Sequence, residues 1–165
     1  MCQEAVNTVS KKTTIFTRDR WAPQFAMWPN VKKLPDLPYS GEERKDDPFH
    51  WGTGPHAGSL ALTFKPKAIF LLGFDLYPID KKTVNNMYKD TEGYTYIKRP
   101  VDPSYWIYQF HKLMGLSDPD VRWIVVNHDR WEMPKEWKSH ANVFQETYEG
   151  MARFINCLLY TSPSP

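Results

Sequence analysis

Two short apolar segments constrain the fold of this chain more than any other feature of its sequence. AIFLLG spans residues 68–73, and VRWIVV spans residues 121–126. Each has the length of a strand, and neither shows the regular apolar–polar alternation of a strand with one face in water. We therefore expect both to be buried strands of the kind that form parallel sheets covered by helices.

The rest of the sequence adds further strands and helices in alternation. Strands are predicted over 13–17, 31–34 and 142–145. Helices are expected over 3–9, from 53 to about 64, from 102 to about 114, and after the last strand. This alternation argues for an α/β fold, a Rossmann-like three-layer sandwich with a mostly parallel sheet.

The ends of two helices are marked by specific residues. Thr53 is the expected N-cap of one helix, and Lys65-Pro66 is expected to stop it. Asp102 and Ser104 are expected to begin the other helix, and Gly115 to end it.

Size, charge and cysteine content limit the functional classes. The 165 residues, with 41% hydrophobic and 24% charged, fit one globular domain, which we place at residues 1–156. The formal charge of +2 without a clustered basic patch argues against a nucleic-acid partner. No apolar run has the length of a membrane span, and the amino end lacks the pattern of a signal peptide. Cys2 and Cys157 provide neither a disulfide framework nor a metal cluster, so a cytoplasmic location without a metal site is expected. The oligomeric state is left open.

A glycine turn is the first candidate for ligand binding. Gly52-Thr53-Gly54 lies at a helix start, where backbone N–H groups and the helix dipole favour an anion such as phosphate. The motif lacks the full G-x-G-x-x-G pattern, so a tight turn with a cap is an equally good interpretation.

The second candidate follows the strand over 68–73. Asp75 comes just after a buried strand, where a carboxylate needs hydrogen-bond donors from a ligand or from the protein. Tyr77 is expected either to contact a base or phosphate or to cover the core. Asp75 is also a candidate catalytic residue.

Other polar side chains lie in loops and at helix ends. Asn86, Tyr88 and Lys89 are candidates for sugar or phosphate contacts, with a solvated surface loop as the alternative. Ser104 and Tyr105 are first of all a helix start, with a ligand role as the alternative.

The histidines are candidates for different roles. His50 and His56 flank the glycine turn and are candidates for acid–base or phosphate contacts, but their spacing does not suit zinc. His111 is interpreted as structural, because it lies inside a predicted helix. His128 follows the strand over 121–126 and is the candidate general base.

Residues 51–77, WGTGPHAGSLALTFKPKAIFLLGFDLY, resemble a known nucleotide-binding core. The resemblance is to bacterial sialyltransferases that use CMP-sialic acid, to motility-associated-factor glycosyltransferases, and to 6-hydroxymethylpterin pyrophosphokinase-like proteins. In the sialyltransferases a helix-opening Ser/Thr-Gly pair and a strand-end G-[IF]-D-[FL]-Y motif line the nucleotide pocket. The matching residues are Thr53, Gly54, Asp75 and Tyr77. The resemblance also implies a downstream histidine as general base, for which His128 is the candidate.

Sequence features near the ends suggest an incomplete domain. The glycine-rich strand and loop that hold the nucleotide in those families are absent, so we expect truncation at one or both ends. DDPFHWGTGPHA, NNMYKDTEGY and VDPSYWIYQF resemble segments of marine bacteriophage proteins, which implies the cytoplasm of a host cell. The last nine residues, CLLYTSPSP, resemble an in-frame translation of a transposon-end sequencing adapter. Residues 157–165 are therefore expected to be disordered and foreign to the natural protein, a fragment from environmental sequencing.

Three functional hypotheses follow from these features. The first is a nucleotide-binding transferase that moves a glycosyl group from a nucleotide-activated sugar, with a CMP-sugar as the implied donor. A bound Mg²⁺ is compatible with the sequence, but nothing in it indicates one. The second is pyrophosphokinase-like phosphoryl transfer from ATP. The third is a non-catalytic phage protein that uses its many Trp and Tyr residues in an interface.

Overall fold

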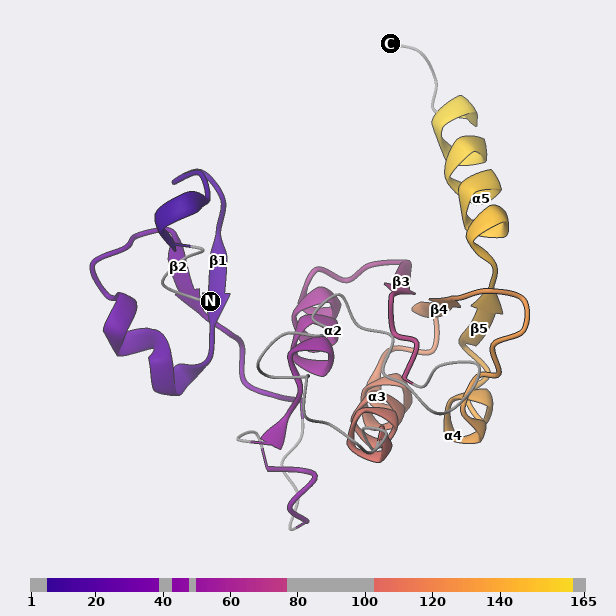
Figure 1. The fold of residues 1–165 in the computed structure, drawn as a ribbon, viewed down its shortest axis with the longest axis horizontal. Helices are drawn as coiled ribbons and strands as arrows, with labels where there is room; N and C mark the ends of the chain where they lie inside the picture. Colours follow the sequence, from indigo (N-terminus) through magenta and orange to yellow (C-terminus); the bar gives the residue numbers. More distant parts are fainter. Residues whose placement is uncertain (1–5, 39–42, 48–49, 77–102, 162–165) are drawn as a thin grey trace, which may run out of the picture. The chain divides into compact units, whose positions relative to one another are not determined.

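The chain forms two compact units, Met1–Leu37 and Pro38–Pro165. The computed structural model describes residues 6–38, 43–47, 50–76 and 103–161, although not the side chains of the last four of these (Figure 1). The single domain over 1–156 stays a prediction, because two compact units can still fold together as one domain.

The first unit contains a two-stranded parallel sheet. Strand β1 (Ile15–Thr17) pairs with β2 (Val31–Lys33), and the 3₁₀ helix η1 (Asp19–Phe25) connects them. Residues 6–8 are helical, within the helix predicted over 3–9. Both strands were predicted, but η1 was not, because Pro23 lies inside it and seven residues are too few to show a helical apolar period.

The second unit is built on a three-stranded parallel sheet in the order β3-β4-β5. Strands β3 (Ala68–Leu72), β4 (Arg122–Val126) and β5 (Val143–Glu146) lie within one or two residues of their predicted ranges. All described strand pairs are parallel, as predicted, although they form two sheets and not one. The fold is thus a Rossmann-like α/β fold.

One face of this sheet forms the core with helices α2 (Thr53–Thr63) and α3 (Ser104–Leu116). Side chains alternate across a strand, and on this face Leu71, Trp123 and Val125 are at most 4% exposed. Phe110 of α3 is fully buried, and its ring contacts those of Phe74, Trp123 and Trp137 at centroid distances of 5.1–6.3 Å. Such edge-to-face aromatic packing joins helix and sheet.

The opposite face meets helix α5 (Tyr148–Thr161). Phe70 of β3 points to this side, where its ring lies 5.6 Å from that of Phe154. Leu72 and Phe144, on the same face by strand alternation, are 46% and 47% exposed. Helices therefore contact both faces of the sheet, but the contact on this second face is much smaller.

Two details of the helices differ from the sequence predictions. The N-cap of α2 is Gly52, not Thr53. Helix α3 continues through Gly115 to Leu116, where Ser117 caps its end by donating from its backbone N–H to the Leu113 carbonyl oxygen and from its hydroxyl to that of Met114. Asp102, the other expected cap, lies outside the described residues.

The carboxyl-terminal half of the second unit holds two further differences. The four-residue helix α4 (Lys135–Lys138) occurs in a segment predicted as loop and is too short to show helical periodicity. Helix α5 extends to Thr161, five residues into the segment expected to be disordered. Leucine favours helices, and neither glycine nor proline interrupts CLLYT, so residues 157–161 have no local reason to end the helix.

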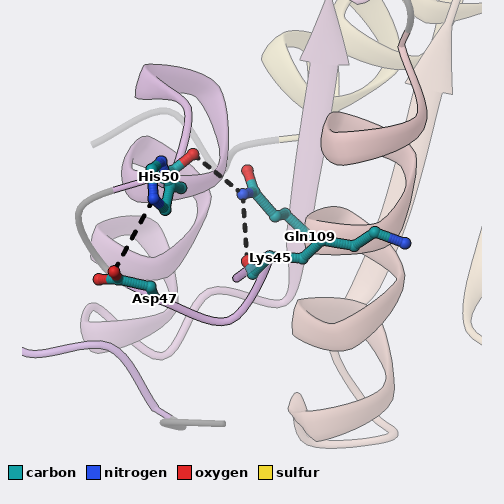
Figure 2. A network of polar contacts seen from close by, with 4 residues as sticks. All are labelled: Lys45, Asp47, His50 and Gln109. Carbon is teal, nitrogen blue, oxygen red and sulfur yellow. Dashed lines mark hydrogen bonds and ion pairs between the residues drawn. The ribbon is translucent and has the colours of Figure 1, made fainter. Parts of the chain in front are cut away.

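A buried glutamine on α3 holds the loop that leads into α2. The Gln109 side-chain nitrogen donates to the carbonyl oxygens of His50 (3.2 Å) and Lys45 (3.4 Å), and its oxygen accepts from the Gly52 N–H at 3.1 Å. Figure 2 shows the amide reaching between the two carbonyl groups, with the His50 ring turned toward Asp47. Gln109 is fully buried, so every polar atom of its amide is matched inside the protein.

Tyr108, the residue before Gln109 on α3, holds the same loop through a second hydrogen bond. The Tyr108 hydroxyl donates to the Asp46 carboxylate at 2.8 Å. Burial, and then this bond to Asp46, raises the pKa of Tyr108 to about 12, so the phenol stays protonated as a donor. Lys45 lies over the Tyr108 ring, 5.1 Å from its centre, in a cation–π contact.

Replacing Gln109 with leucine should destabilise the protein by about 2–4 kcal/mol, because three partly buried backbone groups lose the Gln109 amide as a partner at similar side-chain volume. Urea denaturation followed by tryptophan fluorescence measures this change. Gln24→Leu, at an exposed position in the first unit, is the control and should change stability by less than about 0.5 kcal/mol. Equal stabilities of Gln109→Leu and the unmodified protein would show that the loop does not depend on Gln109.

Candidate functional site

The candidate site lies at the carboxyl ends of β3 and β4. Asp75 follows β3 by three residues, and Asn127 and His128 follow β4 directly. Because β3 and β4 are parallel and paired from Ala68–Arg122 to Leu72–Val126, these side chains meet at one edge of the sheet. This is the edge at which open α/β sheets bind ligands.

The backbone at the end of β3 adopts a conformation that side chains disfavour. Gly73 has φ of 73°, and Leu76, a branched residue, has φ of 56°. Non-glycine residues with positive φ occur where the surrounding structure enforces them, often at functional sites. Asp75 therefore lies in a turn whose shape is set by its contacts.

Asn127 connects the two predicted site residues. It is 2% exposed, its amide nitrogen donates to a carboxylate oxygen of Asp75 at 3.3 Å, and its oxygen accepts from the His128 N–H at 2.9 Å. One buried amide thus orients the carboxylate from β3 and the turn that carries the imidazole from β4.

Two further residues, Trp131 and Gln145, hold this edge of the sheet through hydrogen bonds to backbone carbonyl oxygens. The Trp131 indole N–H donates to the Asp75 carbonyl oxygen at 2.9 Å, and Trp131 is 4% exposed. Gln145 of β5 donates to the Trp131 carbonyl oxygen at 2.7 Å. Residues that follow β4, one of them held in turn by Gln145 of β5, therefore hold the Asp75 turn.

The hydrogen bonds of His128 determine which ring nitrogen carries the proton. The Arg130 backbone N–H lies 3.1 Å from Nδ1, so Nδ1 acts as the acceptor. In the neutral ring the proton is then on Nε2. His128 is partly exposed and so presents an N–H donor at Nε2, whereas the base role expected from the sequence needs a bare nitrogen there.

The glycine turn Gly52-Thr53-Gly54 is shaped by packing. The Gly52 N–H is bonded to Gln109, and a side chain at Gly52 would come within 2.9 Å of the Trp106 ring. A side chain at Gly54 would overlap the ring of Phe74. Both glycines are thus explained without a bound phosphate, which favours the interpretation as a tight turn.

The packing of the turn predicts different effects for two neighbouring substitutions. Gly54→Ala should destabilise the protein by about 1–3 kcal/mol, because the added methyl group displaces the Phe74 ring. Thr53→Ala should cost less than about 0.5 kcal/mol, since Thr53 is exposed and makes no capping hydrogen bond. Urea denaturation of both variants measures the difference. A larger loss for Thr53→Ala than for Gly54→Ala would restore Thr53 as the cap.

The other histidines lie on α2, on α3 and in the loops before α2 and after α4. His50, in the loop before α2, has its Nε2 3.9 Å from an Asp47 carboxylate oxygen, and His56 is buried in α2 at 8% exposure. The His111 ring on α3 lies 2.8 Å from that of His140, measured from Nδ1 to Nε2.

The structure describes only some of the other residues predicted for the site. Tyr77, Asn86, Tyr88 and Lys89 lie outside the described residues, and their roles stay predictions. Ser104 and Tyr105 occupy the first turn of α3, as the helix-start interpretation predicted.

Asn127, Trp131 and His140 were not predicted from the sequence. Asn127 carried a usable signal, because a polar amide directly after a buried strand must find partners at the sheet edge. Trp131 and His140 carried none, since their partners lie 56 and 29 residues away in the chain.

Within the described parts of the chain, no group of three or more His, Cys, Asp or Glu side chains is arranged to hold a metal ion. Of the helices in the described residues, none combines the length and the apolar character that crossing a membrane requires.

Comparisons of the chain with protein-family models, with curated proteins and with solved structures found no match. The functional interpretation therefore depends on the site itself.

Proposed function

We propose that the edge formed by Asp75, Asn127 and His128 binds a nucleotide-activated sugar, and that the protein transfers its glycosyl group. The observation that supports this most is that one buried amide, Asn127, fixes both a carboxylate and an imidazole turn at the carboxyl ends of adjacent parallel strands. Nucleotides bind at this edge in many α/β proteins.

The two side chains have complementary chemistry for such a ligand. The Asp75 carboxylate accepts hydrogen bonds from sugar hydroxyl groups, as acidic residues at this edge do with ribose. His128, with its proton on Nε2, donates to a phosphate oxygen and stabilises the charge that the leaving nucleotide gains. The resemblance to sialyltransferases makes a CMP-sugar the donor to test first.

Isothermal titration of the protein with CMP, CDP, UDP and GDP tests the binding part of the proposal. At least one of these nucleotides should bind, and Asp75→Asn should weaken that binding by about tenfold or more, because it removes a charged acceptor. Asp120→Asn is the matched control, since Asp120 is exposed and precedes β4, at the opposite edge of the sheet.

Release of CMP from a CMP-sugar tests the transfer step. His128→Gln should lower this rate by about 10²-fold, because it removes a donor to the leaving phosphate.

In the titration, binding of ATP with Mg²⁺ but of none of the four nucleotides would support pyrophosphoryl transfer instead. Absence of binding by all five ligands would contradict both enzyme hypotheses.

A non-catalytic interaction protein is the second candidate. It is favoured by the exposed apolar side chains Leu72 and Phe144 on the sheet face opposite the core. If this candidate holds, Leu72→Lys and Phe144→Lys abolish partner binding, whereas Asp75→Asn leaves it unchanged. The reverse pattern supports the ligand-binding edge.

A further inference from the structure

Two histidines join α3 to the turn between α4 and β5. His111 lies in the middle of α3, and His140 lies two residues beyond α4. The His140 Nε2 atom is 2.8 Å from the His111 Nδ1 atom, and the same Nδ1 is 3.0 Å from the Glu136 carbonyl oxygen. The His140 ring packs on Gly115 of α3, where a side chain would come within 3.1 Å of it.

The contacts allow only one arrangement of protons on the neutral rings. The Glu136 carbonyl oxygen can only accept, so His111 Nδ1 must carry a proton and donate it. His140 Nε2 then has to be the bare acceptor of the same N–H group, and the neutral His140 ring carries its proton on Nδ1. The pair is therefore directional, with His111 as donor and His140 as acceptor.

This arrangement responds differently to a first and a second proton. A proton added to His111 goes to Nε2 and leaves the Nδ1–H donor in place. A proton added to His140 goes to Nε2 and sets two N–H groups against each other at 2.8 Å. The contact is therefore compatible with one added proton, which His111 takes at Nε2, but it is lost when a second proton is added to His140.

The surroundings of His140 contain little that would offset a second proton. The charge acting on it is that of His111, and α4 presents the Glu136 carbonyl oxygen to the pair, not a carboxylate. Lys112, the neighbour of His111 on α3, lies over the Tyr108 ring, and Lys135, Lys138, Asp118 and Asp120 are exposed.

Burial, and then the proximity of His111, lowers the pKa of His140 below its ordinary 6.5. The unfolded chain thus binds more protons than the folded protein between the lowered and the ordinary pKa. Stability rises with pH wherever the unfolded state binds more protons. The folded contact is therefore fully favourable above the ordinary pKa and weakens as the pH falls through this window.

We propose that His111 and His140 form a proton-operated latch, which holds the segment from Lys135 to His140 on α3 and releases it when both rings are protonated. The segment lies next to β5, and Trp137 also attaches it to α3: its indole donates to the Ile107 carbonyl oxygen at 2.9 Å, and its ring contacts that of Phe110. In this proposal, release is a local opening of the segment in which β3, β4 and β5 keep their pairing.

Hydrogen exchange of the intact chain, measured by NMR at about pH 7.5 and about pH 5, tests the latch on either side of the ordinary imidazole pKa. After correction for intrinsic exchange, the amides of Trp137, Lys138 and His140 should exchange about tenfold faster at the lower pH, through loss of the histidine contact. The amides of β4 should keep their protection. Equal acceleration in β4 would mean global unfolding and would overturn the proposal.

Two variants and one spectroscopic measurement make the test specific. His140→Gln keeps an acceptor for His111 but cannot titrate, so it should remove the pH-dependent step while retaining protection. His128→Gln is the matched control and should leave the step unchanged. In the unmodified protein, nitrogen chemical shifts of the two rings at neutral pH should show a proton on Nδ1 of both. A proton on His140 Nε2 at neutral pH, or a pH-dependent step that survives in His140→Gln, would overturn the proposal.

Discussion

The buried amide of Gln109 is the contact on which the arrangement of the second unit depends. It fixes Gly52 and the carbonyl groups before it, and therefore fixes where α2 begins. Once α2 starts at this point, Gly54 faces Phe74 and Gly58 faces Phe110 and Trp123. The aromatic rings can then pack against α2, because each glycine leaves room for a ring. A buried polar side chain thus sets the register in which apolar side chains pack.

The strand ends follow the same physical rule. Asn127 is buried at the edge of the sheet, and both ends of its amide are engaged, one by Asp75 and one by the backbone of His128. Gln145 and the Trp131 indole satisfy further backbone groups beside it. Turns that would otherwise expose unmatched polar groups are held by amides and indoles, so the proposed binding edge is rigid before any ligand arrives.

The sequence predicted the strands better than the site. Buried parallel strands are continuous apolar runs, and this local signal located β3 and β4 to within one residue at either end. The glycine turn gave an ambiguous signal, because glycines needed for packing and glycines needed for phosphate binding look the same in a sequence. The positions of Asp75 and His128 were predicted from strand order, but the proton on His128 depends on the Arg130 amide, which no residue pattern reveals.

The sequence by itself determined the α/β class, the three strands of the main sheet and the edge at which Asp75 and His128 lie. These follow from local periodicity and from the fact that parallel strands share a carboxyl edge. The tertiary structure alone decided the partners: Gln109 with the Gly52 turn, Trp131 with Asp75, and His111 with His140. Each of these contacts joins residues at least 29 positions apart, and its direction depends on which atom has a proton to donate. Only the folded chain brings those atoms within hydrogen-bonding distance.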